Sequence, residues 1–204
     1  MPDRIVMPKT DIARKKKAAN WYDSEITYFT NEELHLLFQD KHKILWHTLF
    51  ENAGRISEVL KLTYSDIEKD GSVRITTLKQ RKKSKDKEHP KRLIYFTQEL
   101  QDLIPYKRRN GKYEEGVCIF DENKGYITRQ AASQLLKRTC NRIGIPENKA
   151  HLHTFRHTMA INLLKGGTNI QVLKNILGHK SIVNTLIYLR FSNQDIKQAI
   201  IARQ

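Results

Sequence analysis

The sequence is short of cysteine, of acidic residues and of long apolar runs, and each shortage excludes a class of protein. Cys118 and Cys140 are the only cysteines in 204 residues. We therefore expect no disulfide framework, two reduced and partly buried thiols, and a cytoplasmic setting. No apolar run approaches the roughly 18 residues that a membrane-spanning helix needs, and no apolar N-terminal stretch resembles a signal peptide. We expect no membrane partner.

The shortage of acids leaves the chain strongly basic. Lys and Arg number 37 against 22 Asp and Glu, which gives a formal net charge of +15. Such an excess favours a polyanionic partner, and nucleic acid is favoured over a membrane surface because no lipidation motif is evident. The length of 204 residues fits one domain with a small appendage.

The N-terminal stretch differs from the rest of the chain, because residues 1–24 are basic and show little apolar periodicity. We expect a basic arm or linker whose side chains contact nucleic-acid phosphates through the cluster Arg14, Lys15, Lys16 and Lys17. Ordered structure is expected to begin near Thr30, which forms a capping box with Glu33 at the start of a helix.

Apolar spacing and capping signals predict a chain of helices interrupted by one hairpin. The two predicted strands, 72–78 and 92–97, are rich in Val, Ile, Thr, Tyr and Phe and flank a polar loop over 79–88. The predicted helices cover residues 31–39, 41–52, 56–60, 97–106, 128–143, 154–165, 170–177, 181–189 and 193–202. The sequence therefore predicts an α+β fold that is mainly α-helical with a small antiparallel β-sheet.

The last third of the chain carries the side chains that a tyrosine needs to attack a phosphodiester. His153 and Arg156 form a His-x-x-Arg box, His179 follows Leu177 and Gly178, and Tyr188 comes nine residues later. An arginine fork holds two phosphate oxygens at once, and histidine donates to them or takes the phenol proton. Arg55, at the start of a predicted helix, would complete such a clamp.

These motifs, in this order, resemble the tyrosine recombinase (phage integrase) family over roughly residues 25–192. The resemblance implies the catalytic-domain fold of that family. It also implies a site-specific DNA recombinase or integrase that cleaves and rejoins DNA through a 3′-phosphotyrosyl intermediate. No cofactor, no metal and no small-molecule substrate is expected for such chemistry.

The resemblance also assigns roles to particular residues. Tyr188 is the expected nucleophile, and His153 is the expected acceptor of its proton. Arg55, Arg156 and His179, with His153, are expected to stabilise the negative charge of the phosphorane. Glu58, one turn after Arg55, is expected to hold and neutralise the cationic side chains.

The family places a lysine on the hairpin loop, where its ammonium protonates the departing 5′-oxygen. Lys79, at the end of the first predicted strand, matches that placement. Lys82, Lys83 and Lys85 remain rivals for the role, and we expect them to contact DNA phosphates in any case.

Some of these residues have simpler interpretations. His151, His153 and His157 crowd one stretch, but the cysteine and carboxylate partners of a zinc site are missing. His157 is expected to lie on a different helix face from His153 and to be structural. Taken alone, His179 is more typical of a helix cap and Tyr188 of an amphipathic core residue.

The expected division is an arm over 1–24, a catalytic domain over 25–192 and a C-terminal helix over 193–204. Most members of the family carry a separate core-binding domain before the catalytic one, so this sequence is expected to be a fragment or a minimal recombinase. The last helix either docks on a neighbouring protomer or packs on the helix that bears Tyr188. The expected working unit is a homotetramer assembled on double-stranded DNA.

Three other functions remain open from the sequence. A type IB topoisomerase uses the same chemistry to relax supercoils. A non-catalytic DNA-binding module would keep the fold without the chemistry. A metal-dependent nuclease would need clustered carboxylates, which are absent near these histidines.

Overall fold

The computed structural model describes residues 25–68, 70–77, 90–104, 108–109, 112–113, 119–120 and 127–191. Several predictions lie outside these residues: the basic arm with Arg14, Lys15, Lys16 and Lys17, the loop lysines Lys79, Lys82, Lys83 and Lys85, Cys118 and the tail over 193–204.

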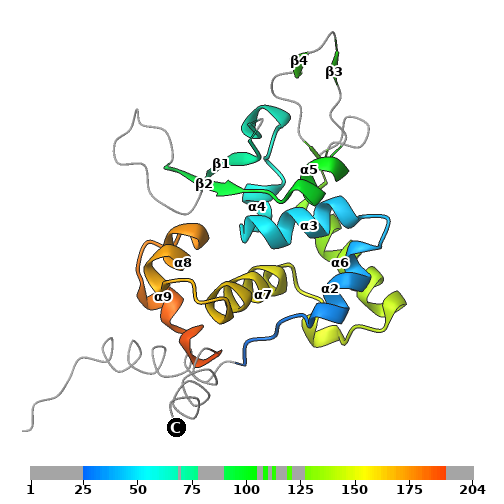
Figure 1. Ribbon diagram of the computed structural model, residues 1–204. Coiled ribbons are helices and arrows are strands. Elements are labelled where there is room, and N and C mark those ends of the chain that lie inside the picture. The colour runs from blue at the N-terminus through cyan, green and yellow to red at the C-terminus, as the bar shows by residue number, and fades with distance from the viewer. Residues whose placement is uncertain are drawn as a thin grey trace, which may run out of the picture.

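The described residues are mainly helical, with small antiparallel strand pairs, so the predicted fold class is confirmed (Figure 1). The α-helices are α2 (Asn31–Phe38), α3 (Lys43–Asn52), α4 (Ile56–Val59), α5 (Gln98–Leu103), α6 (Arg129–Ile143), α7 (Leu152–Lys165), α8 (Ile170–Leu177) and α9 (Val183–Leu186). The strands are β1 (Ser72–Thr76), β2 (Lys91–Tyr95), β3 (Arg108–Arg109) and β4 (Lys112–Tyr113). Short 3₁₀ turns are η1 (Tyr64–Asp66), η2 (Glu147–Lys149) and η3 (Leu189–Phe191). None of the helices described combines the length and the apolarity needed to cross a membrane.

Capping side chains set the ends of the helices where the sequence predicted them. Glu33 N donates to Thr30 Oγ1 at 3.2 Å and Thr30 N donates to Glu33 Oε2 at 2.7 Å, which confirms the capping box. Thr128 Oγ1 accepts from Ala131 N at 3.1 Å at the start of α6. Gly144 ends α6 with φ +79°, a conformation that glycine adopts without strain.

The predicted hairpin is present as β1 and β2. The strands pair antiparallel with Val73 opposite Ile94 and Ile75 opposite Arg92. Thr77 N donates to Pro90 O at 2.9 Å and extends the ladder by one bond. Val73, Ile75 and Ile94 are buried, so this face of the sheet enters the core. The second pair, β3 and β4, was not predicted, because strands of two residues show no alternation.

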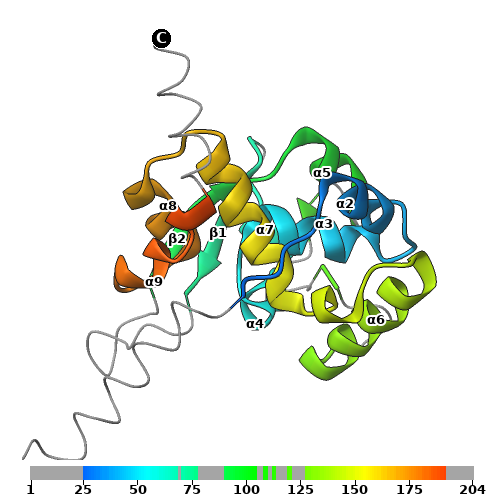
Figure 2. The same ribbon diagram turned by 90° about the horizontal axis from the view of Figure 1, so that it is seen from below.

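Helix α7 lies at the centre of the molecule and joins two parts of the core. It packs against α3 and α6 on one side and α8 on the other, as Figures 1 and 2 show. Phe155 stacks on Trp46 of α3 with ring centroids 5.8 Å apart. Further along α7, Ile161 belongs to a cluster with Leu173, Leu177 and Tyr188. The first turns of α7 are therefore held from several directions.

Two predicted helix boundaries are wrong, one at the His-x-x-Arg motif and one at the segment that carries Tyr188. Helix α7 begins at Leu152 and not at residue 154, so His153 lies inside its first turn. The helix predicted over 181–189 is divided into α9 and η3, and Tyr188 lies between them. Tyr188 N donates to Thr185 O at 3.1 Å, an i→i−3 bond of 3₁₀ type. Val183, Thr185 and Ile187 are β-branched, which disfavours a longer regular α-helix here.

Candidate active site

Arg55 stands at the start of α4, directly after α3, and is tied to Glu58 one turn later. Arg55 Nη1 donates to Glu58 Oε1 at 3.0 Å, and Arg55 N donates to Glu58 Oε2 at 3.2 Å. The Glu58 side chain is 0% exposed, whereas that of Arg55 is 15% exposed. The carboxylate therefore fixes the Arg55 fork at the edge of the buried region.

A further arginine, Arg92 of β2, holds the other side of the same carboxylate. Arg92 Nη1 donates to Glu58 Oε2 at 3.0 Å and to Thr77 Oγ1 at 3.3 Å, and its Nη2 donates to Asn52 Oδ1 at 3.2 Å. Burial tends to raise the pKa of Glu58, but the charges of Arg92 and Arg55 outweigh it and hold that pKa below its ordinary value. Arg92 thus joins α3, α4 and the hairpin at one point.

Gly54 provides the space for this arrangement. The end of α3 turns at Ala53, which has φ +46°. A Cβ at Gly54 would lie 2.3 Å from Asn52 Oδ1 and 3.1 Å from Arg92 Nη2. A left-handed alanine costs about 1–2 kcal/mol. The strained turn presents the Ala53 carbonyl to Arg156.

Arg156 lies in the buried part of α7 and is fixed by two backbone carbonyls. Its Nη1 donates to Ala53 O and its Nη2 to Leu177 O, each at 2.6 Å. Burial, followed by the nearby charge of Arg55, lowers the pKa of Arg156 to about 10. The guanidinium remains charged at neutral pH. It also has N–H groups beyond those two bonds, because a guanidinium carries five.

His179 occupies the turn between α8 and α9. Gly178 ends α8 with φ +63°, and a Cβ there would lie 3.2 Å from Arg92 Nη1, so the turn needs glycine for both conformation and space. His179 Nδ1 lies 2.9 Å from Thr185 Oγ1. Burial, followed by the charge of Arg156, lowers the pKa of His179 to about 3. The ring is therefore neutral at neutral pH.

Tyr188 is buried, and its hydroxyl contacts His157. The side chain is 1% exposed within the cluster formed by α7 and α8. Tyr188 Oη lies 2.8 Å from His157 Nδ1. Burial raises the pKa of Tyr188, although Arg156 acts in the opposite direction. Burial, followed by the charge of His153, lowers the pKa of His157 to about 4. Both groups are thus neutral near pH 7.

The prediction that His157 lies on a different helix face from His153 is wrong. Residues four apart in an α-helix differ by only about 40° around the axis, so they share a face. The two imidazole centroids are 6.2 Å apart, and His153 is exposed while His157 is half-buried. His157 therefore contacts the expected nucleophile, a role that was not predicted from the sequence.

The described residues that the sequence singled out gather around one place. Arg55 and Glu58 follow the end of α3, and His153 and Arg156 lie in the first turns of α7. His179 and Tyr188 lie in the segment after α8. The positive charges of Arg55, Arg92 and Arg156 all act on His179. Such a concentration of buried cations, balanced by the one carboxylate of Glu58, favours an anion. Thr77, two residues before Lys79, is part of the same network.

A groove runs beside this cluster, between β2 and α8. It has a volume of about 610 Å³. Gly178, His179 and Arg92 line it, together with Lys174 and Lys180. The groove therefore connects the candidate site with a basic surface.

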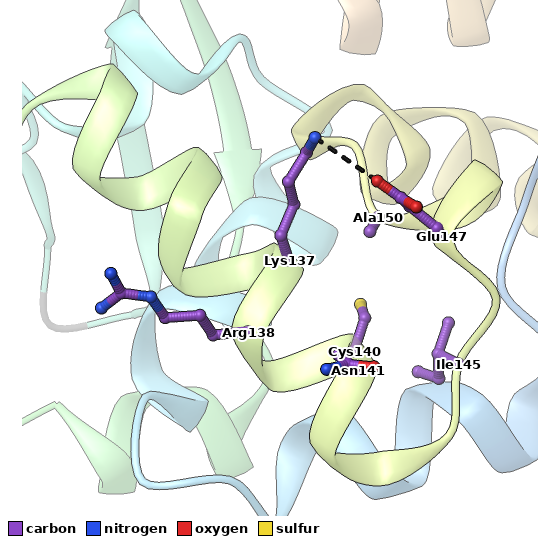
Figure 3. Close-up of a pocket in the computed structure, with 7 residues that line it drawn as sticks. All are labelled: Lys137, Arg138, Cys140, Asn141, Ile145, Glu147 and Ala150. Carbon is purple, nitrogen blue, oxygen red and sulfur yellow. Dashed lines mark ion pairs between the residues drawn. The ribbon is translucent and has the colours of Figure 1, made fainter.

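A second cavity, of about 380 Å³, lies on α6 and η2, at the other side of α7 from the candidate site. Figure 3 shows the Cys140 thiol between Lys137 and Ile145, with Lys137 paired to Glu147. Burial raises the pKa of the Cys140 thiol to about 11, so it stays protonated. Within the described segments, no group of three His, Cys, Asp or Glu side chains is arranged to hold a metal ion.

The two histidines with lowered pKa values make stability depend on pH. The folded-state pKa values are about 4 for His157 and about 3 for His179, against an ordinary value of 6.5. Just below pH 6.5 the unfolded chain binds protons that the folded chain does not, so acid lowers the free energy of unfolding. The slope should approach about 1.4 kcal/mol per pH unit for each histidine.

Urea unfolding between about pH 6.5 and 5 measures this slope before carboxylates such as Glu58, whose pKa is lowered, begin to titrate. His157→Gln and His179→Gln should each lower the slope of unfolding free energy against pH by the contribution of one histidine. A slope that both variants leave unchanged would contradict the buried, neutral state of these rings.

Arg92→Met is expected to destabilise the fold strongly. It leaves the fully buried Glu58 carboxylate with one cation in place of two, and Asn52 Oδ1 without its donor. Breaking a buried pair typically costs about 3–5 kcal/mol, and the remaining Arg55 contact places our expectation near 3 kcal/mol. Urea denaturation gives the free energy of unfolding.

Arg74→Met in β1 is the matched control, because Arg74 pairs with Glu68 at 3.2 Å but the two side chains are 62% and 46% exposed. Exposed pairs contribute between 0 and about 1 kcal/mol. Equal losses in the two variants would show that the Arg92 network adds no particular stability.

Comparison with known proteins identifies the family and the fold. The model of the phage integrase family matches residues 31–195, so the chain belongs to that family. Its sequence is similar to tyrosine recombinase XerD from Corynebacterium glutamicum, with 28% identity over 163 residues, which cover 78% of this chain and 51% of that protein. Tyrosine recombinase XerC from Leptospira interrogans is 28% identical over 179 residues, which cover 85% of this chain and 54% of XerC. The chain thus spans about half the length of these curated relatives.

Solved structures show that the fold is that of a tyrosine recombinase catalytic domain. XerH recombinase bound to its palindromic difH substrate, in a post-cleavage complex, aligns with a TM-score of 0.64 and 20% identity over 87% of this chain and 53% of that one. The catalytic domain of bacteriophage HP1 integrase aligns with a TM-score of 0.62 and 22% identity over 86% of this chain and 94% of that domain.

Proposed function

We propose that residues 25–192 act as the catalytic domain of a site-specific DNA recombinase that cleaves and rejoins DNA through a 3′-phosphotyrosyl intermediate. The observation that carries the proposal is the meeting of Arg55, Arg156, His179 and Tyr188 around the first turns of α7. They come from separate parts of the chain. The names of the relatives, tyrosine recombinases XerC and XerD, support the same class of reaction.

The clamp would act on the negative charge of the scissile phosphate. Arg156 is held rigidly by two carbonyls and Arg55 by Glu58, so neither fork has to reorganise when charge develops. The charge of Arg55 lowers the pKa of Arg156, and an anion between the two guanidinium groups would relieve that repulsion. A neutral His179 with Nδ1 bound to Thr185 is suited to donate from its other nitrogen.

The proposed chemistry is a pair of transesterifications. The oxygen of Tyr188 bonds to phosphorus while the bond from phosphorus to the 5′-oxygen breaks, and that oxygen takes a proton from an acid, for which we propose Lys79. A 5′-hydroxyl from a second duplex then displaces the tyrosine. The phosphotyrosyl link conserves the energy of the phosphodiester, so rejoining needs no nucleotide cofactor.

Strand exchange between two duplexes requires four cleavages, so we propose a homotetramer assembled on double-stranded DNA. The net charge of +15 favours DNA as the partner. XerH was solved bound to its difH substrate, which supports DNA as the partner for this fold. The basic arm over 1–24 and the tail over 193–204 are proposed to contribute to DNA contacts and to docking between protomers.

Trapping of a covalent adduct tests the proposal. The full chain is incubated, with EDTA present, with a pool of short duplexes that have a randomised centre and a single nick. Cleavage of the nicked strand, on the 5′ side of the nick, releases the short strand between the cleaved phosphate and the nick. This strand carries the 5′-hydroxyl, so its loss by diffusion prevents rejoining. We expect an adduct that survives detergent, and sequencing the trapped DNA identifies the preferred site. No adduct from any member of the pool would favour a non-catalytic DNA-binding module.

DNA binding should depend strongly on salt through the groove beside the site. Lys174 and Lys180 line this groove, so we expect them to contact phosphates. Each neutralised phosphate contributes about −0.9 to the slope of log affinity against log salt for B-DNA. The double variant Lys174→Gln, Lys180→Gln should flatten the slope by up to about two such units.

Lys137→Gln is the matched control, because Lys137 lies on α6 by the second cavity. Its slope should equal that of the unmodified chain. Fluorescence anisotropy with a labelled duplex measures both variants. An equal change in the two slopes would place the DNA elsewhere.

A further inference from the structure

We propose that His157, and not His153, takes the proton from Tyr188 when the phenol attacks, which makes His157 a catalytic residue. The inference rests on the proposed function. It is carried by a direct contact, because Tyr188 Oη lies 2.8 Å from His157 Nδ1. A general base has to lie within about 2.6–3.2 Å of the atom that gives up the proton.

Both partners are fixed in position. The Tyr188 ring is 1% exposed and packs among side chains of α7 and α8, such as Ile161 and Leu173. His157 is half-buried and lies one residue after Arg156, whose guanidinium is bound to two carbonyls. The proposed base and a phosphate-binding arginine thereby lie on one helix, α7, and the nucleophile packs against that helix.

The proton balance of the step is simple. In the reactive arrangement the phenol O–H donates to the lone pair of Nδ1, and the other ring nitrogen carries the hydrogen of the neutral imidazole. As the bond between Tyr188 oxygen and phosphorus forms, the O–H bond breaks and the proton moves to Nδ1. The imidazolium then faces the phosphorane, whose negative charge it helps to balance. When the link is reversed, the same ring returns the proton to the phenolate.

The surrounding charges would keep this step inactive until DNA binds. Besides burial, His153, Arg156 and Arg190 act on His157 from α7 and from η3, and together these effects lower its pKa to about 4. The pKa of Tyr188 is raised by burial. Proton transfer is therefore unfavourable in the free chain. A phosphodiester at Arg156 adds negative charge beside the ring and raises the pKa of His157, so that the substrate itself activates the nucleophile.

The contact has a competing structural interpretation, in which His157 fastens Tyr188 in the core and keeps it from DNA. The burial of the phenol is compatible with that interpretation, since a phosphate reaches the oxygen only after some movement of the segment around η3. The two interpretations predict opposite effects. Removal of a base slows formation of the adduct, whereas removal of a fastener leaves it unchanged or accelerates it.

The test combines His157→Gln with a fluorinated tyrosine at position 188. Glutamine retains polarity but does not accept a proton, so the single-turnover rate of adduct formation on the nicked duplex should fall about 100-fold or more. A fluorinated tyrosine has a more acidic phenol, which needs a base less. It should restore most of the rate in the His157→Gln chain, and a purely structural loss would not be restored. Duplex affinity should stay within about twofold, because no stable charge is removed.

His153→Gln is the matched control, because His153 lies on the same face of α7 one turn earlier. Its rate should not be restored by the fluorinated tyrosine. Restoration in His153→Gln alone would return the role to His153. A rate in His157→Gln equal to or above that of the unmodified chain would establish the fastener, and a slow rate that fluorination leaves slow would also overturn the proposal.

A second experiment, the dependence of the rate on pH, needs no substitution at position 157. In the unmodified chain a bound base makes the rate level between about pH 7 and 9, whereas ionisation by solvent would raise it about tenfold per pH unit. Failure of the proposed function itself has a different signature. It is the absence of any adduct in the unmodified chain, or an adduct that persists in Tyr188→Phe.

Discussion

Tyr188→Phe is expected to abolish the covalent protein–DNA adduct and to leave DNA affinity nearly unchanged. The substitution removes one oxygen, the proposed nucleophile, and no positive charge. Phenylalanine keeps the ring that packs in the core between α7 and α8, so the fold should survive. Loss of the bond to His157 should lower the free energy of unfolding by only about 1 kcal/mol. Gel shift and detergent-resistant adduct, measured on the same nicked duplex, give both quantities.

Tyr64→Phe is the matched control. Tyr64 is 4% exposed and, like Tyr188, lies within an apolar cluster, but in the part of the core under the sheet. It should form the adduct at the rate of the unmodified chain. If Tyr188→Phe still formed a detergent-resistant link, another residue would be the nucleophile.

Arg55→Ala and Arg156→Ala are expected to slow cleavage by about 100-fold or more each. Loss of one preorganised donor to a developing oxyanion costs roughly 3 kcal/mol of transition-state stabilisation. The two variants should differ in stability. Arg156→Ala leaves the buried carbonyls of Ala53 and Leu177 without a donor, at about 1–3 kcal/mol each, whereas Glu58 keeps Arg92 when Arg55 is removed.

Single-turnover cleavage well below the melting temperature of each variant separates chemistry from unfolding. Lysine at either position should restore only part of the rate, because an ammonium lacks the planar fork. Arg138→Ala, on α6 by the second cavity, is the control and should cleave normally. Full rates with lysine at both positions would contradict the two-oxygen clamp.

The sequence predicted those parts of the molecule that are specified locally. The capping box at Thr30, the caps of α6 and the β-branched and aromatic residues of β1 and β2 are short-range signals. The structure contains the helix starts and the hairpin that they predicted. Only the family resemblance indicated which distant residues come together in the fold. These residues are Arg55, His153, Arg156, His179 and Tyr188. The periodicity of the chain does not predict that Arg156 binds the carbonyl of Ala53 after α3 and that of Leu177 at the end of α8.

Arg92 and His157 were missed for different reasons. Arg92 occupies an inward position of β2, because Ile94 two residues later is buried while Leu93 and Tyr95 are exposed. A charged residue at such a position was a usable signal, but its partner Glu58 lies 34 residues away and is visible only after folding. His157 was missed because the helical spacing from His153 was misjudged.

The burial of Tyr188 could not be predicted from sequence either. A phenol nine residues after His179 is compatible with an exposed position as well as with a core position. The outcome depends on the change from α9 to the tighter η3 and on the room that Leu173 and Leu177 leave beside α7. The free chain thus keeps its proposed nucleophile neutral and covered.

The chemical identity of the protein–DNA link tests most directly whether Tyr188 is the nucleophile. The adduct trapped on a nicked duplex is digested with a protease and a nuclease, and the nucleotide-bearing peptide is sequenced by tandem mass spectrometry. We expect a single modified peptide, with a phosphotyrosyl bond between Tyr188 and the 3′ end of the cleaved strand. A link to a serine, to another tyrosine or to a 5′-phosphate would contradict it.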